Sequence, residues 1–196
     1  MEREAVGAVA LTVAAADWRT AVDDLEARCA RIVGEALSQA TPLPWLRQGE
    51  VSIFLSDDDG IKELNSSYRR RNQPTNVLSF PNLDLERGDA LSPPPPGPVL
   101  LGDVAMSLQR LKEEALDLNK PIIDHFSHLL VHGALHLLGY DHEDDDEAEV
   151  MEEMEATILS RLGVAPPYEA EERAPVHGGQ AEGDQTLGSQ ASGATS

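Results

Sequence analysis

His128-Leu-Leu-Val-His132-Gly-Ala-Leu-His136-Leu-Leu-Gly139-Tyr-Asp-His142 carries the strongest signal in this chain. His132 and His136 are four residues apart, so on a helix their imidazoles share one face, one turn apart. Gly139 then ends the helix, because glycine readily takes the left-handed conformation that reverses the chain. The reversal can bring His142 back toward the same face. Three neutral imidazoles with one open position are the ligand set of a catalytic zinc site.

The helix that carries this motif is predicted over 121–138. Pro121 suits a first helical turn, and the leucines supply strong helix formers and an apolar surface to bury. A lone histidine on such a helix is usually just packed in the core, but the glycine stop and a third histidine beyond it favour metal binding. His125 and His128 share the helical face and are not needed as ligands, and His128 is interpreted as a packing residue or a partner of a ligand.

The same histidine spacing occurs in a large group of zinc proteases. Those proteins carry a glutamate directly after the first histidine, and it serves as the general base for peptide hydrolysis. Here that position is Gly133, which can do no acid–base chemistry. The sequence therefore keeps the metal geometry and argues against a protease.

Composition bounds the class of protein. A chain of 196 residues is long enough for one domain with a proper core. The sequence contains no run of 18 apolar residues, the length that would suggest a membrane span. The acidic N-terminal segment lacks a clear cleavage site and is interpreted as a strand rather than a signal peptide. A single cysteine, Cys29, fits a reducing cytosol, so a cytoplasmic location is expected. Cys29 lies on an apolar helical stripe and is expected to be a buried, inert thiol.

The net charge of −20 is unevenly distributed. Residues 141–196 hold fifteen acidic and two basic side chains, and residues 1–140 hold twenty acidic and thirteen basic ones. Phosphate binding relies on lysine and arginine, so RNA binding must rest on a local basic patch. Arg69, Arg70 and Arg71 form such a patch, although a solvated loop that happens to be basic is the alternative.

The order of predicted elements points to one domain followed by a tail. Strands are predicted at 6–13, 50–55, from 77, and at 99–108, and helices at 18–37, 60–68, 109–119, 121–138 and from the acids at 143–147 to 162. Asp17 is expected to cap the first helix, and the acids at 57–59 the second. The last helix should bury a stripe of Val150, Met151, Met154, Ile158 and Leu162. A domain is therefore placed at 1–163 with a proline-rich insertion at about 82–98, and a disordered acidic tail at 164–196 in which His177 is isolated.

Four separate motifs give the chain a resemblance to the YbeY family of bacterial endoribonucleases, the ribosomal RNA maturation factors. They are Leu64-Asn65 with Tyr68-Arg69, Pro74-Thr75-Asn76-Val77-Leu78-Ser79-Phe80-Pro81, Gly102-Asp103-Val104, and His132-Gly-x-Leu-His136-Leu-x-Gly139-Tyr140-Asp141-His142. The resemblance covers roughly residues 7 to 162. The family often has an aspartate two residues before the Pro-Thr pair, and Asn72 stands there in this chain.

The resemblance implies an α+β fold, a zincin-like single domain whose mixed β-sheet packs with about five helices. It also implies a three-histidine site at the end of a central helix, with His132, His136 and His142 as ligands of one zinc ion. Arg69 matches the family's functionally important arginine and is the expected catalytic residue. The implied partners are single-stranded RNA, small-subunit ribosomal RNA, the small ribosomal subunit and its assembly factors, without DNA or membrane.

The function that the resemblance implies is zinc-dependent, single-strand-specific endoribonuclease activity in 3′-end maturation of small-subunit ribosomal RNA and in ribosome quality control. We hypothesise that Arg69 holds the scissile phosphate while zinc activates water. No general base is identified, and Asp103 and Asp141 are candidates only as partners of the histidines or as turn residues. The alternatives are a non-catalytic ribosome-assembly accessory factor with bound zinc, and a metal-dependent hydrolase of another substrate class.

Overall fold

The computed structural model describes residues 7–40, 43, 45–83, 85, 97–142 and 144–165. The tail from residue 166, with His177, and the greater part of the predicted insertion lie outside the described residues. In chain order the described elements are β1 (Ala8–Val13), α1 (Trp18–Ala21), α2 (Leu25–Ala40), η1 (Leu46–Gln48), β2 (Glu50–Ser56), α3 (Asp58–Arg69), β3 (Val77–Pro81), β4 (Leu100–Ser107), α4 (Leu108–Asp117), α5 (Ile122–Leu137) and α6 (Asp145–Leu162).

A four-stranded mixed sheet in the order β1-β2-β4-β3 forms the centre of the molecule. Strands β1, β2 and β4 are parallel, with Ile53 of β2 opposite Leu11 on one side and Val104 on the other. Strand β3 runs antiparallel to β4, with Ser79 opposite Val104, and forms one edge of the sheet. The prediction of an α+β fold with a mixed sheet is therefore confirmed.

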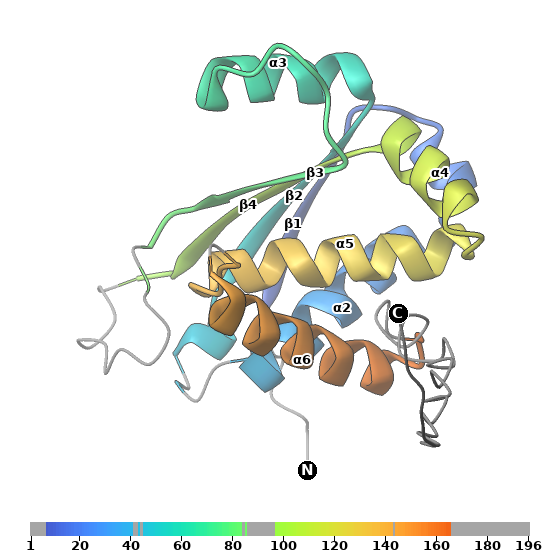
Figure 1. Ribbon diagram of the computed structural model, residues 1–196. Helices are drawn as coiled ribbons and strands as arrows, with labels where there is room; N and C mark the ends of the chain where they lie inside the picture. The colour runs from blue at the N-terminus through green and yellow to red at the C-terminus, as the bar shows by residue number, and fades with distance from the viewer. Residues whose placement is uncertain are drawn as a thin grey trace, which may run out of the picture.

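The helices cover the two faces of the sheet unequally. Figure 1 shows α2, α5 and α6 together on one face and α3 alone on the other. The large core lies under α2, α5 and α6, where Trp18, Leu37 and Phe126 are fully buried. A smaller core of Ile61, Leu78 and Ala105 joins α3 to the opposite face. Because α5 packs directly on β3 and β4, the sheet fixes the position of the histidine helix.

The prediction of a single helix over 18–37 is wrong, because the structure has two helices there, α1 and α2. Val22 is extended, and Asp24 takes a positive φ of 47°, which breaks the helical path between them. Asp17 has helical dihedrals and makes no side-chain cap, so its predicted role is also wrong. The apolar period runs through the break, because both segments bury their stripe in the same core. This division gives six α-helices among the described residues, where about five were expected.

Most other elements lie close to their predicted positions. Asp57 caps α3 by accepting a 3.0 Å hydrogen bond from Gly60 N, and Asp144 caps α6 in the same way through Glu147 N. Cys29 is fully buried, and burial, with a smaller contribution from Glu26, raises the pKa of its thiol to about 12. The burial of Cys29 predicted from the sequence is therefore confirmed.

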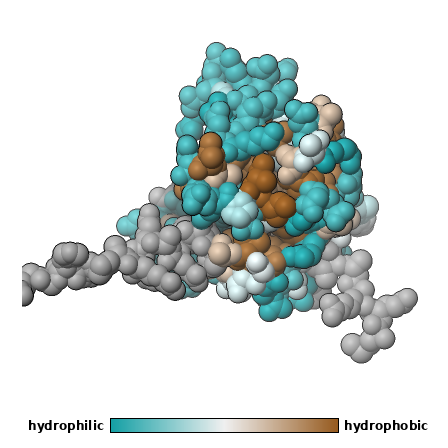
Figure 2. Space-filling view, turned by 90° about the vertical axis from the view of Figure 1, so that its right-hand side faces the viewer, coloured by the Kyte–Doolittle hydropathy of each residue, from teal (hydrophilic) through white to brown (hydrophobic). Residues whose placement is uncertain are grey.

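The surface of the described residues is mostly polar. Figure 2 views the α4 side of the molecule, where hydrophobic residues gather in the middle of a hydrophilic surround. Four large hydrophobic side chains are exposed among the described residues: Tyr68, Leu100, Leu116 and Leu118. None of the helices in the described ranges combines the length and the apolar character that a membrane crossing requires.

Candidate metal centre

The turn after α5 brings the third histidine back to the first two. Gly139 has a φ of +82°, the left-handed conformation that was predicted for it. A Cβ atom at this position would also collide with the carbonyl oxygen of Leu85, so the turn needs glycine for two reasons. Tyr140 anchors the reversed chain, because its buried hydroxyl donates a 3.1 Å hydrogen bond to the Ala40 carbonyl of α2.

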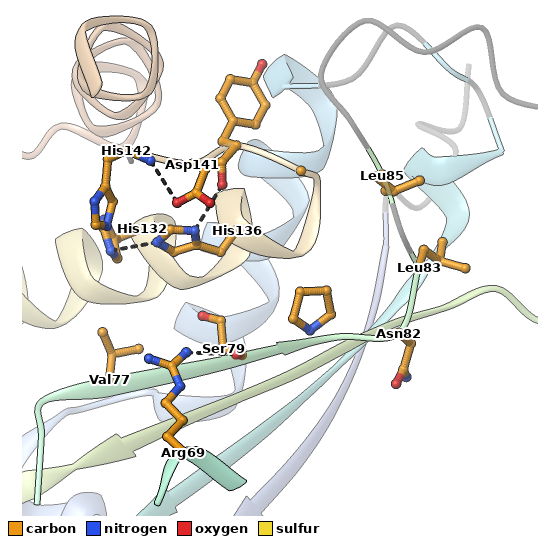
Figure 3. Close-up of a pocket in the computed structure, with 13 residues that line it drawn as sticks. Arg69, Val77, Ser79, Asn82, Leu83, Leu85, His132, His136, Asp141 and His142 are labelled. Atoms are coloured by element: carbon orange, nitrogen blue, oxygen red, sulfur yellow. Dashed lines mark hydrogen bonds between the residues drawn. The ribbon is translucent and has the colours of Figure 1, made fainter. Parts of the chain in front are cut away.

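His132, His136 and His142 converge on one point. A ring nitrogen from each can be chosen so that all three lie within 4.8 Å of one another. The Nε2 atoms of His132 and His136 are 3.1 Å apart, and the ring of His142 stands beside both (Figure 3). The structure thus brings together the three residues that the sequence singled out.

The tautomers of two histidines follow from what their other ring nitrogens contact. His132 Nδ1 lies 2.7 Å from Oε1 of Glu155, and His136 Nδ1 lies 2.9 Å from the carbonyl oxygen of Tyr140. An ionised carboxylate and a backbone carbonyl only accept hydrogen bonds, so both Nδ1 atoms must carry the proton. In the neutral rings both Nε2 atoms therefore present lone pairs, and these lone pairs face each other.

Two lone pairs at 3.1 Å repel each other unless a cation lies between or beside them. The donor set therefore fits a metal ion, which binds neutral imidazole nitrogen. Partners of the non-coordinating nitrogen are the usual way in which proteins fix the orientation of a metal-binding imidazole. Glu155 and the Tyr140 carbonyl supply these partners for His132 and His136.

The electrostatics of the site keep Glu155 charged and His136 neutral. Burial of the Glu155 carboxyl favours its neutral form, but hydrogen bonds from His128 and His132 prevail and lower its pKa to about 2. Burial, and then the neighbouring His132 and His142, lower the pKa of His136 to about 4. His136 is therefore unprotonated, as a metal ligand must be, over the neutral pH range.

His128 and His125 lie on the same helix but outside the converging group. His128 Nε2 is 3.1 Å from the second oxygen of Glu155, so His128 supports the carboxylate that supports His132. His125 is buried, and its Nε2 lies 2.8 Å from Oε2 of Glu114 on α4. Neither residue is among the three whose nitrogens converge, as the sequence predicted.

Neither of the two aspartates proposed as partners of the histidines hydrogen-bonds an imidazole among the described residues, although the charge of Asp141 opposes the lowering of the His136 pKa. Asp141 accepts a 2.8 Å hydrogen bond from the backbone nitrogen of His142, which is a turn role (Figure 3). Asp103 is exposed on β4. Sequence reasoning missed Glu155, which does the work expected of them. The available signal was a lone acid in the apolar stripe of α6, where Met151, Ile158 and Leu162 are buried beside it.

Arg69 faces the histidines across a pocket of about 750 Å³. One wall comes from the end of α5 and the turn after it, and the other from β3 and the segment that follows. Arg69 belongs to α3 on the far face of the sheet, yet it reaches past the β3 edge, where its Nη2 donates a 3.3 Å hydrogen bond to the Ser79 carbonyl (Figure 3). Arg70 and Arg71 are exposed and do not line this pocket.

Gly133 is required by the packing of α5 on the sheet. A Cβ atom there would lie 2.8 Å from Val104 Cγ1 and 3.2 Å from Ser79 Oγ. The Ser79 hydroxyl also donates a 3.2 Å hydrogen bond to the Gly133 carbonyl. A glutamate at this position, as in the zinc proteases, would not fit against the sheet without displacing β3 or β4.

Fold and site together define a small α+β protein with three converging histidines, which could hold a metal ion, opposite an arginine. The family model described as Endoribonuclease YbeY matches residues 13–163, and the chain belongs to this family. A relative named Endoribonuclease YbeY from Paramagnetospirillum magneticum is 48% identical over 162 residues, which cover 82% of this chain and 94% of the relative.

Two further similarities extend over most of the chain. A protein of the same name from Rhodopseudomonas palustris is 42% identical over 175 residues, covering 88% of this chain and 87% of the relative. A solution structure of a Thermotoga maritima protein aligns with 86% of this chain and 98% of its own, at 21% identity and a TM-score of 0.47.

Proposed function

We propose that this chain is a zinc-dependent, single-strand-specific endoribonuclease that matures the 3′ end of small-subunit ribosomal RNA and serves ribosome quality control. The observation that carries the proposal is the arrangement of Arg69 and three converging histidines across one pocket. Membership of a family described as endoribonucleases supports the reaction class. The proposed partners are the small ribosomal subunit and its assembly factors, and the catalytic domain is placed within 1–163.

Zinc is the metal that the ligands favour. Imidazole nitrogen suits zinc, and a catalytic zinc site has three protein ligands with one position open to water. The converging group among the described residues consists of three histidines, which leaves such a position. When bound there, zinc would lower the pKa of a water molecule to about 7 and polarise a phosphoryl oxygen.

Arg69 is proposed as the catalytic residue that holds the scissile phosphate. One of its five N–H donors is used by the Ser79 carbonyl, and among the described residues no acidic side chain forms an ion pair with it. The remaining donors can bind two oxygens of a phosphate and stabilise the charge that develops there during cleavage. The hydrogen bond to the Ser79 carbonyl keeps the Arg69 guanidinium at the pocket. The side chain therefore loses less conformational entropy when the guanidinium binds a phosphate.

Two other functions compete with the nuclease proposal. Peptide hydrolysis lacks a base at Gly133, and the packing of α5 leaves no room for one. A ribosome-assembly accessory factor with structural zinc is the second candidate, because an acidic chain can bind basic ribosomal proteins. Structural zinc sites normally use four protein ligands, and the three histidines favour catalysis over this role.

Two matched variants test the proposal on an unprocessed 3′ fragment of small-subunit ribosomal RNA. Arg69→Ala should retain the bound metal, because Arg69 is not one of the three converging residues, and lose at least about tenfold in cleavage rate, because the guanidinium proposed to bind the phosphate is removed. His136→Ala, purified identically, should lose both metal and cleavage and controls for contaminating nucleases. Equal cleavage by all three proteins would refute the nuclease. Absent cleavage of both the fragment and whole ribosomal particles would favour the accessory factor.

A further inference from the structure

An aromatic pair lies on the outer side of the β3 edge, directly next to the pocket. Tyr68, the last aromatic residue of α3, packs on Phe80 of β3 with ring centroids 5.1 Å apart and the planes tilted by 57°. Tyr68 is 71% exposed, and it is the one aromatic among the large hydrophobic side chains exposed in the described part of the chain. The contact with Phe80 orients the Tyr68 ring, and its exposure leaves an aromatic surface on which another ring can stack.

The pair is continuous with the proposed catalytic pocket. Tyr68 is followed by Arg69, and Phe80 lies between Ser79 and Pro81, and all three of these neighbours line the pocket. Side chains alternate along a strand, so Phe80 faces the α3 side while Ser79 and Pro81 face the histidines. A flexible chain leaving the pocket over the β3 edge therefore passes to the side of the sheet on which Tyr68 packs against Phe80.

Two further arginines, Arg70 and Arg71, directly follow Arg69 on a loop that hydrogen bonds hold to α3. The backbone nitrogen of Arg71 donates a 3.2 Å hydrogen bond to the Asn65 carbonyl. The Asn65 side chain is 3% exposed and donates a 2.7 Å hydrogen bond to the Gln73 carbonyl. Arg70 and Arg71 are both exposed, and among the described residues neither forms an ion pair with an acid. These two positive charges on a protein of net charge −20 form a local basic site that attracts a polyanion.

We propose that Tyr68, supported by Phe80, is a stacking site for a base of single-stranded RNA that flanks the cleaved bond, with Arg70 and Arg71 on its phosphates. This inference rests on the proposed function and extends it to a substrate subsite outside the catalytic pocket. A base stacked on an exposed aromatic ring between basic side chains is the general mode by which proteins bind single strands. A paired base has both faces covered, so the subsite also explains selection of single strands.

A tryptophan placed at position 68 reports stacking directly. The variant Tyr68→Trp, loaded with metal, is titrated with a short single-stranded RNA hexamer whose integrity is checked on a gel. Trp18 is fully buried, and the wild-type signal corrects for it and for Trp45. Emission from the introduced tryptophan should be quenched in a saturable manner by the single strand. The same sequence as a duplex, and a hexamer of abasic nucleotides, should quench little.

The affinity of the hexamer, measured by the anisotropy of a terminal fluorescein, provides the second readout. Tyr68→Phe should bind as the wild type does, whereas Tyr68→Leu should bind about 5- to 100-fold more weakly, the range expected for one base–aromatic stack. Leu116→Ala is the matched control, because Leu116 is 80% exposed on α4 and far along the chain from this site. Thermal unfolding of each variant separates lost stacking from lost folding.

The outcomes separate this inference from the nuclease proposal. Quenching together with weak binding by Tyr68→Leu supports the subsite, even if no variant cuts RNA. A wild type that cuts, with no quenching and with normal binding by Tyr68→Leu, overturns the subsite alone. Absence of both RNA binding and RNA cleavage overturns both proposals.

Discussion

At the scale of single residues, the metal centre depends on a carboxylate remote from it in sequence. Glu155 is 1% exposed and accepts hydrogen bonds from His132 and His128, so it orients a proposed ligand and lies outside the converging group. The three converging histidines could be predicted, because they lie within eleven consecutive residues and helical geometry relates them. The contact between His132 and Glu155 could not be predicted from the sequence, because it depends on how α6 packs on α5.

Replacing Glu155 tests its orienting role. Glu155→Gln keeps the size of the side chain but removes the charge, and the affinity for zinc should fall about 10- to 100-fold, as for other outer partners of metal ligands. Competition with a chromogenic chelator measures this affinity. Glu152→Gln, an exposed change on the same helix, is the control. Unchanged affinity in Glu155→Gln would remove the residue from the account.

His125 gives the stability of the chain a defined pH dependence. Burial lowers its pKa below the ordinary 6.5, although Glu114 acts in the opposite direction. Below about pH 6.5 the unfolded chain binds a proton that the folded chain does not, so acidification should reduce stability, by at most about 1.4 kcal/mol per pH unit for one group. Urea unfolding at pH 7.5, 6.5 and 5.5 should show a smaller loss for His125→Gln than for the wild type. Identical pH profiles would exclude this contribution.

At the scale of elements, the end of α5 shows what the sequence can and cannot predict. The end of the helix before Gly139 was predictable, because only glycine readily takes the left-handed conformation that the turn requires. The division of the first helix at Asp24 was not, because the apolar period continues across it and the break depends on how α1 and α2 share the core. The position of Arg69 at the pocket likewise required the pairing of β3 with β4.

Two glycines that end helices form a matched pair for testing the turn. Gly139 and Gly163 both have a positive φ, but a Cβ at Gly163 would meet nothing within 4 Å. Gly163→Ala should therefore cost about 1–2 kcal/mol of stability, from backbone strain alone, and retain metal affinity. Gly139→Ala should cost more, because of the collision with Leu85, and should weaken metal binding by displacing His142.

Denaturant unfolding and metal titration of both variants provide the measurements. Normal metal affinity in Gly139→Ala would show that the turn does not hold His142 in place.

At the scale of the whole molecule, the sheet separates two tasks. The face under α2, α5 and α6 carries the large core and the histidines, while α3 on the other face ends at Arg69 and is followed by Arg70 and Arg71 (Figure 1). Arg69 alone of the three arginines crosses the β3 edge to line the pocket. The proposed RNA-binding edge is thus basic, although the chain as a whole carries a net charge of −20.

The proposed boundary between domain and tail predicts the effect of truncation. The described core ends with Leu162, with Val164 packed against it. Removing residues 166–196 should therefore leave the free energy of unfolding within about 0.5 kcal/mol of the full chain, the range for changes outside packed regions. Urea denaturation of both proteins measures this difference. A loss of several kcal/mol would place part of the tail in the folded domain.

The central claim is that one metal ion at the three histidines produces RNA cleavage. The most direct measurement titrates metal-free protein with zinc and follows cleavage of the ribosomal RNA 3′ fragment at each step. The cleavage rate should rise linearly and level off at about one equivalent of zinc per chain, with no rise for His136→Ala. A rate that is independent of zinc, or that rises equally in His136→Ala, would contradict this claim.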